Sequence, residues 1–263
     1  MAETADTSIV PVPSSSTDQQ PPGPKPAEDL PDEGREMTLM EHMVELRDRL
    51  VKAVLGLAVG TVLGFVFARQ VFEMLIAPLP EAAKIVALSP TDTIIQYFKV
   101  ALVLGAIVSM PVILYQIMQF VLPGLYPHER RYLYWLLPAG TIAFASGAVF
   151  SSLVVVPFSI RYLSGFMADL VSPTYQVQSY IGFVTSLMFW LGIVFEMPLV
   201  IYFLAKLGVI DYRKLVGARK YAIVIAAVAA AVITPTPDPV TMMLVMVPLV
   251  VLYEIGIFLA RLA

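Results

Sequence analysis

The chain has 263 residues, of which 58% are hydrophobic and only 14% are charged, against roughly 25% charged residues in an average soluble protein. One soluble core cannot bury that much apolar surface, so we predict a membrane protein. The chain has no cysteine and two histidines. This excludes disulfides and thiolate chemistry and argues against a histidine metal site. The absence of a basic stripe argues against nucleic-acid binding.

Residues 1–36 differ from the rest of the chain. They hold seven of the 21 prolines, set among Ser, Thr, Gln and acidic residues. Such a segment cannot bury a core, so we predict that it is a disordered tail. It lacks a basic start followed by an apolar run and is therefore not a secretory signal. We expect no function of its own, with docking of a partner as the alternative.

Six apolar stretches follow the tail and predict an all-α membrane domain of six transmembrane helices over residues 37–263. The predicted spans are 50–69, 98–122, 132–160, 180–206, 220–234 and 240–259. The fifth uncharged stretch, 221–233, reaches only about 20 Å as a helix, whereas the hydrocarbon core is about 30 Å thick. We therefore expect short fifth and sixth helices in a spanning or re-entrant hairpin. Prolines within the stretches predict kinked, curved helices.

The first stretch carries three glycines on one helical face. Gly56, Gly60 and Gly64 recur every four residues, which suits close contact between helices. We expect this face to pack within the chain, with a dimer contact as the alternative.

The distribution of Lys and Arg predicts the orientation in the membrane. Thirteen of them fall on the side of both termini and four on the other side. Because cytoplasmic loops are enriched in Lys and Arg, we expect both termini to be cytoplasmic.

Two glutamates lie inside apolar stretches, Glu196 in the fourth and Glu254 in the sixth. An ionisable residue at membrane depth is costly and usually faces a polar partner or a wet cavity. We expect Glu196 to contact a substrate or a partner helix. The alternative is a protonated carboxyl bonded to a backbone carbonyl that Pro198 leaves free. For Glu254, a functional and a structural role are equally supported.

A further candidate site is polar and lies at the cytoplasmic surface. Apolar spacing predicts an amphipathic helix over 41–50, which lies on the membrane surface or extends the first span. If this helix meets the loop at 123–131, Glu45 and Glu129 could together hold a guanidinium group by bidentate bonds. Local pairing with neighbouring arginines is the alternative. These arginines are Arg47, Arg49, Arg130 and Arg131.

Motifs for catalysis are absent from the sequence. There is no phosphate-binding loop and no His-Glu-x-x-His zinc motif. Both histidines, His42 and His128, lie outside the apolar stretches, so an intramembrane serine hydrolase has little support. We expect no enzymatic activity, no catalytic residues, no metal site and no cofactor.

Seven short motifs after the tail resemble those of one membrane protein family. They are EHMVELRDRL at 41–50, APL at 77–79, PVILYQ at 111–116, LYPHERR at 125–131, FEMP at 195–198, TPD at 236–238 and EIG at 254–256. Over residues 38–261 the chain is thus similar to TatC, the multispanning core subunit of the twin-arginine protein translocase.

The resemblance implies a glove-shaped fold and a receptor for protein export. TatC-like proteins bind the twin-arginine signal peptides of folded substrates at the cytoplasmic face, and their acidic positions match Glu45 and Glu129. For this cluster the resemblance favours ligand binding over local pairing. Neighbouring positions of that site are His42, Leu46, Arg47 and His128. The buried glutamate of the family, on the concave face, matches Glu196.

The resemblance also implies partners. The family works with the single-span proteins TatB and TatA in a multimeric complex of the bacterial inner membrane, driven by the proton-motive force. Candidate partner contacts at the last two helices are Thr234, Thr236, Met242 and Glu254. Candidate functional residues of the outer loops are Pro78 and Asp238. Met242 stands where many relatives have a glutamine, so we expect no polar contact from this position.

A proton-coupled secondary transporter of small solutes is the alternative function. Kinked helices and Glu196 are compatible with it. The motifs and proline positions show no internal repeat, however, and the acidic cluster lies at the surface rather than at the membrane midplane.

Overall fold

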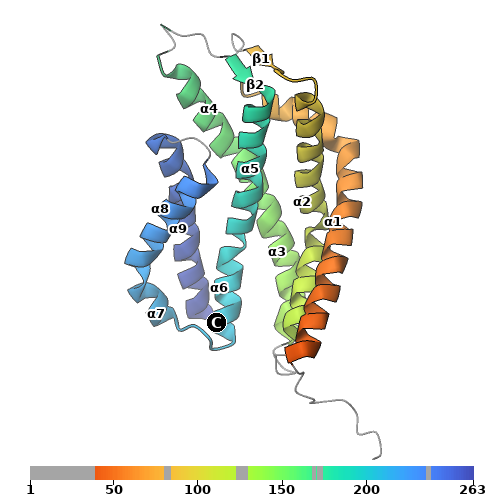
Figure 1. Cartoon of the computed structure of the whole chain (residues 1–263). Helices are drawn as coiled ribbons and strands as arrows, with labels where there is room; N and C mark the ends of the chain where they lie inside the picture. Colours follow the sequence, from red (N-terminus) through yellow and green to blue (C-terminus); the bar gives the residue numbers. More distant parts are fainter. Residues whose placement is uncertain (1–38, 80–83, 123–129, 168–169, 171–173, 235–237) are drawn as a thin grey trace, which may run out of the picture. The chain divides into compact units, whose positions relative to one another are not determined.

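The computed structural model describes residues 39–79, 84–122, 130–167, 170, 174–234 and 238–263. The predicted tail lies outside the described residues, as do His128, Glu129 and Thr236. Residues Leu39–Ala263 form one unit built almost wholly of helices (Figure 1). Five helical segments of this unit are long and apolar enough to cross a membrane.

The first two long helices, α1 (Leu39–Ile76) and α2 (Asp92–Val121), pack side by side. The amphipathic segment 41–50 is continuous with the first span, so α1 is a single helix of 38 residues. A Cβ atom on Gly60 would lie 2.6 Å from the carbonyl oxygen of Gly105 in α2, and Gly64 meets Ala101 as closely. This confirms that the glycine face packs within the chain.

The third and fourth spans are each interrupted. The third runs through α3 (Arg130–Phe150), a π-helical turn η2 (Ser151–Val155) and α4 (Val156–Gly165). The fourth consists of α5 (Val177–Phe195) and α6 (Met197–Lys206), with a break at Glu196. Pro157 and Pro198 stand in the first turn after these interruptions, where a missing N–H costs least. Proline thus follows the break in these two spans, whereas Pro111, Pro138 and Pro248 lie inside continuous helices.

The last helices are α7 (Tyr212–Gly217), α8 (Arg219–Ile233) and α9 (Pro239–Leu262). With 15 residues, α8 extends only about 22 Å and is too short to count among the five candidate spans. Its shortness confirms one prediction, but α9 has 24 residues, about 36 Å, and is long enough to span. The expectation of a short sixth helix is therefore wrong, because α9 begins at Pro239 and continues to Leu262, beyond the predicted stretch.

A feature that the sequence did not indicate is a pair of parallel strands, β1 (Lys84–Val86) and β2 (Thr174–Gln176). They belong to the connections that follow α1 and α4 and lie at one end of the bundle (Figure 1). We call this the sheet end. The first residues of α1 and the C-terminus lie at the opposite end.

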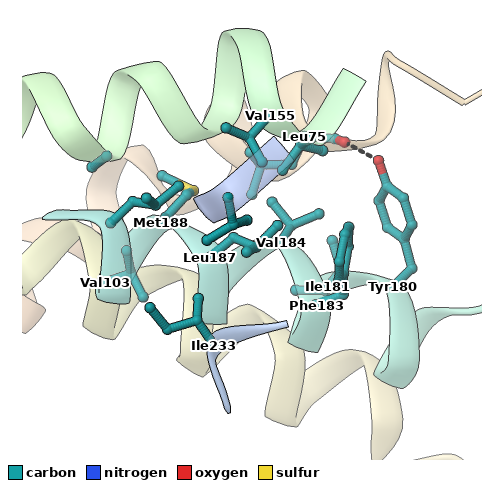
Figure 2. Close-up of a cluster of buried hydrophobic side chains, with 14 of the residues drawn as sticks. Leu75, Val103, Val155, Tyr180, Ile181, Phe183, Val184, Leu187, Met188 and Ile233 are labelled. Carbon is teal, nitrogen blue, oxygen red and sulfur yellow. Dashed lines mark hydrogen bonds between the residues drawn. The ribbon is translucent and has the colours of Figure 1, made fainter. Parts of the chain in front are cut away.

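The hydrophobic core is centred on α5. Ile181, Val184 and Leu187 are fully buried at helical spacing, and they face α2, η2 and α9 (Figure 2). Tyr180 extends the core toward the sheet end, where its hydroxyl donates a 2.6 Å hydrogen bond to the carbonyl of Leu75. Large apolar side chains elsewhere, especially on α1, are exposed, as expected for a surface in contact with lipid.

Candidate functional site

The first turns of α1 are held against the last turn of α2 by an aromatic contact. The imidazole of His42 stacks on the ring of Phe120, with ring centroids 4.3 Å apart. Phe120 was not singled out from the sequence, because it is far from His42 along the chain. The stack fixes the start of α1 and thereby the position of the acidic residue one turn further on.

That residue, Glu45, is half-buried and only partly satisfied. Its Oε1 atom accepts a 3.2 Å hydrogen bond from Nη2 of Arg49, one turn later. Its Oε2 atom is buried and has no hydrogen-bond partner among the described residues. Local pairing, the alternative considered above, is thus present but uses only one of the two carboxylate oxygens.

Two faces of this segment differ in exposure. The side chains of Glu45 and Arg49 are 17% and 25% exposed, whereas those of Arg47 and Asp48 are 71% and 54% exposed. Arg47 and Asp48 pair with each other at 2.9 Å and face the surroundings. Leu46 is also exposed. The half-buried carboxylate is therefore bordered by an exposed apolar side chain and an exposed ion pair.

The second half of the predicted cluster, His128 and Glu129, lies outside the described residues. Helix α3 is described from Arg130 onward. The meeting of Glu45 with Glu129 remains a prediction.

Glu196 occupies the break between α5 and α6. Its carbonyl accepts the N–H groups of Leu199 and Val200, each at 3.0 Å, so it begins α6. Its side chain lies against α3, since a Cβ atom on Gly140 would stand 2.9 Å from Glu196 Oε2. The Oε1 atom is buried without a hydrogen-bond partner among the described residues. The proposed bond to a freed backbone carbonyl is therefore not found among them.

Gly140 is a positioning residue that the sequence reasoning missed. It leaves room for the Glu196 carboxyl group and for Leu114 of α2, whose Cδ1 would be 2.7 Å from a Cβ atom there. Further along the same contact, Gly147 of α3 faces Phe195 and Gly192 of α5 faces Phe144. The small residues Gly140 and Gly147 in the third span could have indicated this close helix contact from the sequence.

Contacts within the chain occupy the candidate partner residues Thr234 and Met242 and the outer-loop candidate Asp238. Thr234 is buried and its hydroxyl donates a 2.8 Å bond to the carbonyl of Ala230. Met242 is half-buried against the main core. Asp238 caps α9 by accepting a 2.6 Å bond from the N–H of Thr241.

Glu254 is paired rather than isolated. Its Oε2 lies 2.7 Å from Nη2 of Arg219, so it joins α9 to the first residue of α8. The adjacent Tyr253 donates a 2.9 Å bond to the carbonyl of Leu215 in α7. These bonds give Glu254 a structural role in the hairpin. Pro78, by contrast, lies in the turn that follows α1.

The described residues contain no group of three His, Asp or Glu side chains that could hold a metal ion. The candidate carboxylates are single groups on separate apolar helices, and two of them, Glu45 and Glu254, are paired with an arginine. Such carboxylates can pair with a cationic ligand.

Comparison with known proteins decides the family. The family model "Sec-independent protein translocase protein (TatC)" matches residues 41–248. The chain belongs to the TatC family. A TatC protein of Aquifex aeolicus is 42% identical over 233 residues, covering 86% of this chain and 96% of the relative. A chloroplastic relative of Pisum sativum is 34% identical and covers 90% and 68%.

Solved TatC structures agree with this assignment. A crystal structure titled a twin-arginine translocase receptor superposes with a TM-score of 0.75 at 42% identity, covering 84% of this chain and 99% of that one. A second TatC structure, in DDM, gives 0.77 at 41% identity. The chain is therefore a membrane component of the twin-arginine protein translocase, a family that serves protein transport rather than enzymatic catalysis.

Proposed function

We propose that this TatC-family protein is the receptor for twin-arginine signal peptides, and that Glu45 binds one of the two guanidinium groups. The observation that carries the proposal is the half-buried Glu45 carboxylate, whose Oε2 atom has no donor among the described residues. A guanidinium group presents paired N–H donors that match two carboxylate oxygens. Arg49 donates a hydrogen bond to Oε1 only, so an incoming arginine can donate one to the Oε2 atom of Glu45.

In this proposal the surroundings of Glu45 supply the remaining contacts. Glu129 binds the second arginine, with His128 beside it. His42 and its stack on Phe120 hold the start of α1 in place. The exposed Leu46 offers an apolar contact to the hydrophobic part of the signal peptide.

The test is binding of a signal peptide to the purified protein in nanodiscs, comparing an Arg-Arg peptide with its Lys-Lys twin. Lysine keeps the charge but loses the fork geometry. A charged hydrogen bond contributes about 1.5–3 kcal/mol, so Glu45→Gln should weaken Arg-Arg binding by about tenfold or more.

Asp48→Asn is the matched control. It removes an acidic group from the same helix, but one that is exposed and paired with Arg47. It should leave the affinity close to that of the wild type. Equal binding of both peptides, or equal loss in both variants, would contradict the proposed site.

Glu196 acts after recognition in this proposal. Its half-buried carboxyl group at the α5–α6 break contacts the apolar part of the signal peptide or a partner helix as that segment enters. Glu196→Ala should therefore leave peptide affinity unchanged but reduce export of a folded reporter in cells. Wild-type export would show that the carboxyl group is dispensable.

We further infer that the protein recruits single-span TatB- and TatA-type partners along α8 and α9 and works in a multimeric complex.

The distribution of Lys and Arg supports an inner-membrane orientation with both termini cytoplasmic. Arg47 and Arg49 belong to the first turns of α1 and Lys206 is the last residue of α6, whereas Lys84 is the first residue of β1 at the sheet end. Export uses the proton-motive force.

A further inference from the structure

A lysine lies inside the second span. Lys99 follows Asp92, the first residue of α2, by seven residues and is therefore about 10 Å along the helix from its start. Its side chain is exposed and has no ion-pair or hydrogen-bond partner among the described residues. The carboxylate of Asp92 already accepts the N–H groups of Leu88 and Ser89. A cation at this depth is costly unless a negative group meets it.

The side chain of Lys99 reaches toward α5 at a position that has no side chain. Its Nζ atom is 4.0 Å from the place where a Cβ atom on Gly182 would stand. The glycine cannot cover the ammonium group, which therefore stays accessible beside the backbone of α5.

Gly182 begins a row of exposed and half-buried residues along α5. Ser186, Phe189 and Ile193 follow it at intervals of four, three and four residues and so lie on the same helix face. Phe189 and Ile193 are 39% and 40% exposed, although the other side of the helix forms the core. Glu196 follows three residues later at the end of α5. We call these five residues the α5 stripe.

The α5 stripe has an ionisable group at each end. Lys99 lies beside Gly182, and Glu196 comes 14 residues after that glycine, which is a distance of about 21 Å along a helix. Between the two ends, Phe189 and Ile193 present apolar side chains. The stripe therefore fits an apolar helix of about 14 residues.

A helix that lies on the α5 stripe has a defined direction when its arginines bind at Glu45. Glu45 belongs to the first turns of α1, at the end opposite the sheet end, so the C-terminal end of the bound helix points toward Lys99. The last four carbonyl groups of a helix have no partner within it and carry the negative end of its dipole. In hydrocarbon these carbonyl groups need donors, and an ammonium group offers three.

We propose that Lys99 is a further binding residue of the receptor, whose ammonium group binds the C-terminal carbonyl groups of the signal peptide's apolar helix. This inference rests on the proposed receptor function and adds a second contact to it. Glu45 selects the arginine pair before the apolar segment, and Lys99 recognises the point where the apolar helix ends. An apolar segment that ends too early does not reach Lys99, so the receptor discriminates signal peptides by length.

The test compares two synthetic signal peptides that end at the last apolar residue, one with a free C-terminal carboxylate and one with an amide. Their affinities for the full-length protein are measured in nanodiscs of phosphatidylcholine. A carboxylate pairs with an ammonium group, whereas an amide carries no charge. The ratio of carboxylate to amide affinity should therefore be about fivefold higher for the wild type than for Lys99→Gln. Lys99 is exposed, so the variant should fold.

Lys84→Gln is the matched control for charge. Lys84 is also exposed and lies at the sheet end, but it pairs with Thr174 in the strand pair, before α5 begins. Its removal should leave the ratio as in the wild type. An unchanged ratio in Lys99→Gln, or an equal fall in Lys84→Gln, would overturn the proposal.

A parallel measurement separates this proposal from the receptor function on which it rests. The preference for an Arg-Arg over a Lys-Lys peptide depends on Glu45 and should be the same in Lys99→Gln as in the wild type. Loss of that preference in the wild type would refute the receptor site itself. A normal preference together with an unchanged carboxylate ratio would refute the role of Lys99 alone.

Disulfide cross-linking tests the position of the bound helix, since the natural chain has no cysteine. A peptide cysteine in the last two turns of the apolar segment should cross-link to Ser186→Cys. One placed about seven residues earlier should cross-link to Ile193→Cys, because the peptide runs antiparallel to α5. Val59→Cys, exposed on α1, is the control and should not react. Failure of the peptide's end to reach Ser186→Cys would overturn the contact with Lys99.

Discussion

At the scale of single residues, Gly140 has the clearest structural consequence. At this position of α3, the Glu196 carboxyl group and the side chain of Leu114 occupy the space that a Cβ atom would need. The position of Glu196 thus depends on a neighbour that has no side chain.

Gly140→Ala should therefore destabilise the protein, by about 1–3 kcal/mol as for other overpacked sites. Thermal unfolding in detergent measures this as a lower Tm. Part of the loss should be recovered in Gly140→Ala/Glu196→Ala, where the carboxyl group is gone and only the contact with Leu114 remains. Gly165→Ala is the control, because nothing lies within 4 Å of its would-be Cβ. Equal Tm values for the two single variants would contradict this account.

The contacts of site residues could be predicted from the sequence only where both partners lie on the same helix. The pairing of Glu45 with Arg49 follows from their spacing of four residues on one helix. The stack of His42 on Phe120 and the contact of Glu196 with Gly140 join different helices. These contacts depend on the angle and register of packed helices, which a single sequence does not specify.

At the scale of elements, the α1–α2 pair rests on backbone contact. The would-be Cβ of Gly60 meets the carbonyl oxygen of Gly105, and that of Gly105 meets the backbone of Thr61 at 2.5 Å. Backbone atoms cannot move aside as a flexible side chain can, so the helices would have to separate.

Gly60→Ala should lower the stability of the protein by more than Gly182→Ala. The nearest neighbour of a Cβ at Gly182 is Lys99 Nζ at 4.0 Å, an ordinary contact. The expected loss for Gly60→Ala is about 1–3 kcal/mol. Measurement of Tm in the same detergent compares the two variants, and a Gly60→Ala protein as stable as Gly182→Ala would rule out close backbone packing as the reason for this glycine.

The positions of the long helices were predictable from the sequence, because an uncharged apolar run long enough to cross the hydrocarbon core indicates a membrane-spanning helix. The π turn and the strand pair were not. The π turn, Ser151–Val155, adds one residue inside the uncharged stretch 132–160, which runs through it without interruption. The strands are three residues long and pair across a large sequence separation. Neither the π turn nor the strand pair produces a local sequence pattern from which it could be predicted.

At the scale of the whole molecule, the alternation of helices predicts that the α6–α7 connection and the β1 segment lie on opposite sides of the membrane. The natural chain has no cysteine, so single cysteines report their side without background. Val209→Cys should be labelled only from the cytoplasm and Leu88→Cys only from the other side, since both positions are exposed. Reversed labelling would contradict the proposed orientation.

The polar ties between α1–α2 and α5 gather at the sheet end. There β1 pairs with β2, Tyr180 binds the carbonyl of Leu75, and Gln176 Nε2 lies 3.4 Å from Asp92 Oδ2. At the opposite end, the last turn of α2 meets α6 through apolar side chains around Met118. Apolar contacts are non-directional and tolerate sliding, whereas hydrogen bonds hold their geometry. Directional bonds therefore hold the two groups of helices at the sheet end, and we expect any change in the angle between them to be taken up at the opposite end, where α1 begins and Glu45 lies.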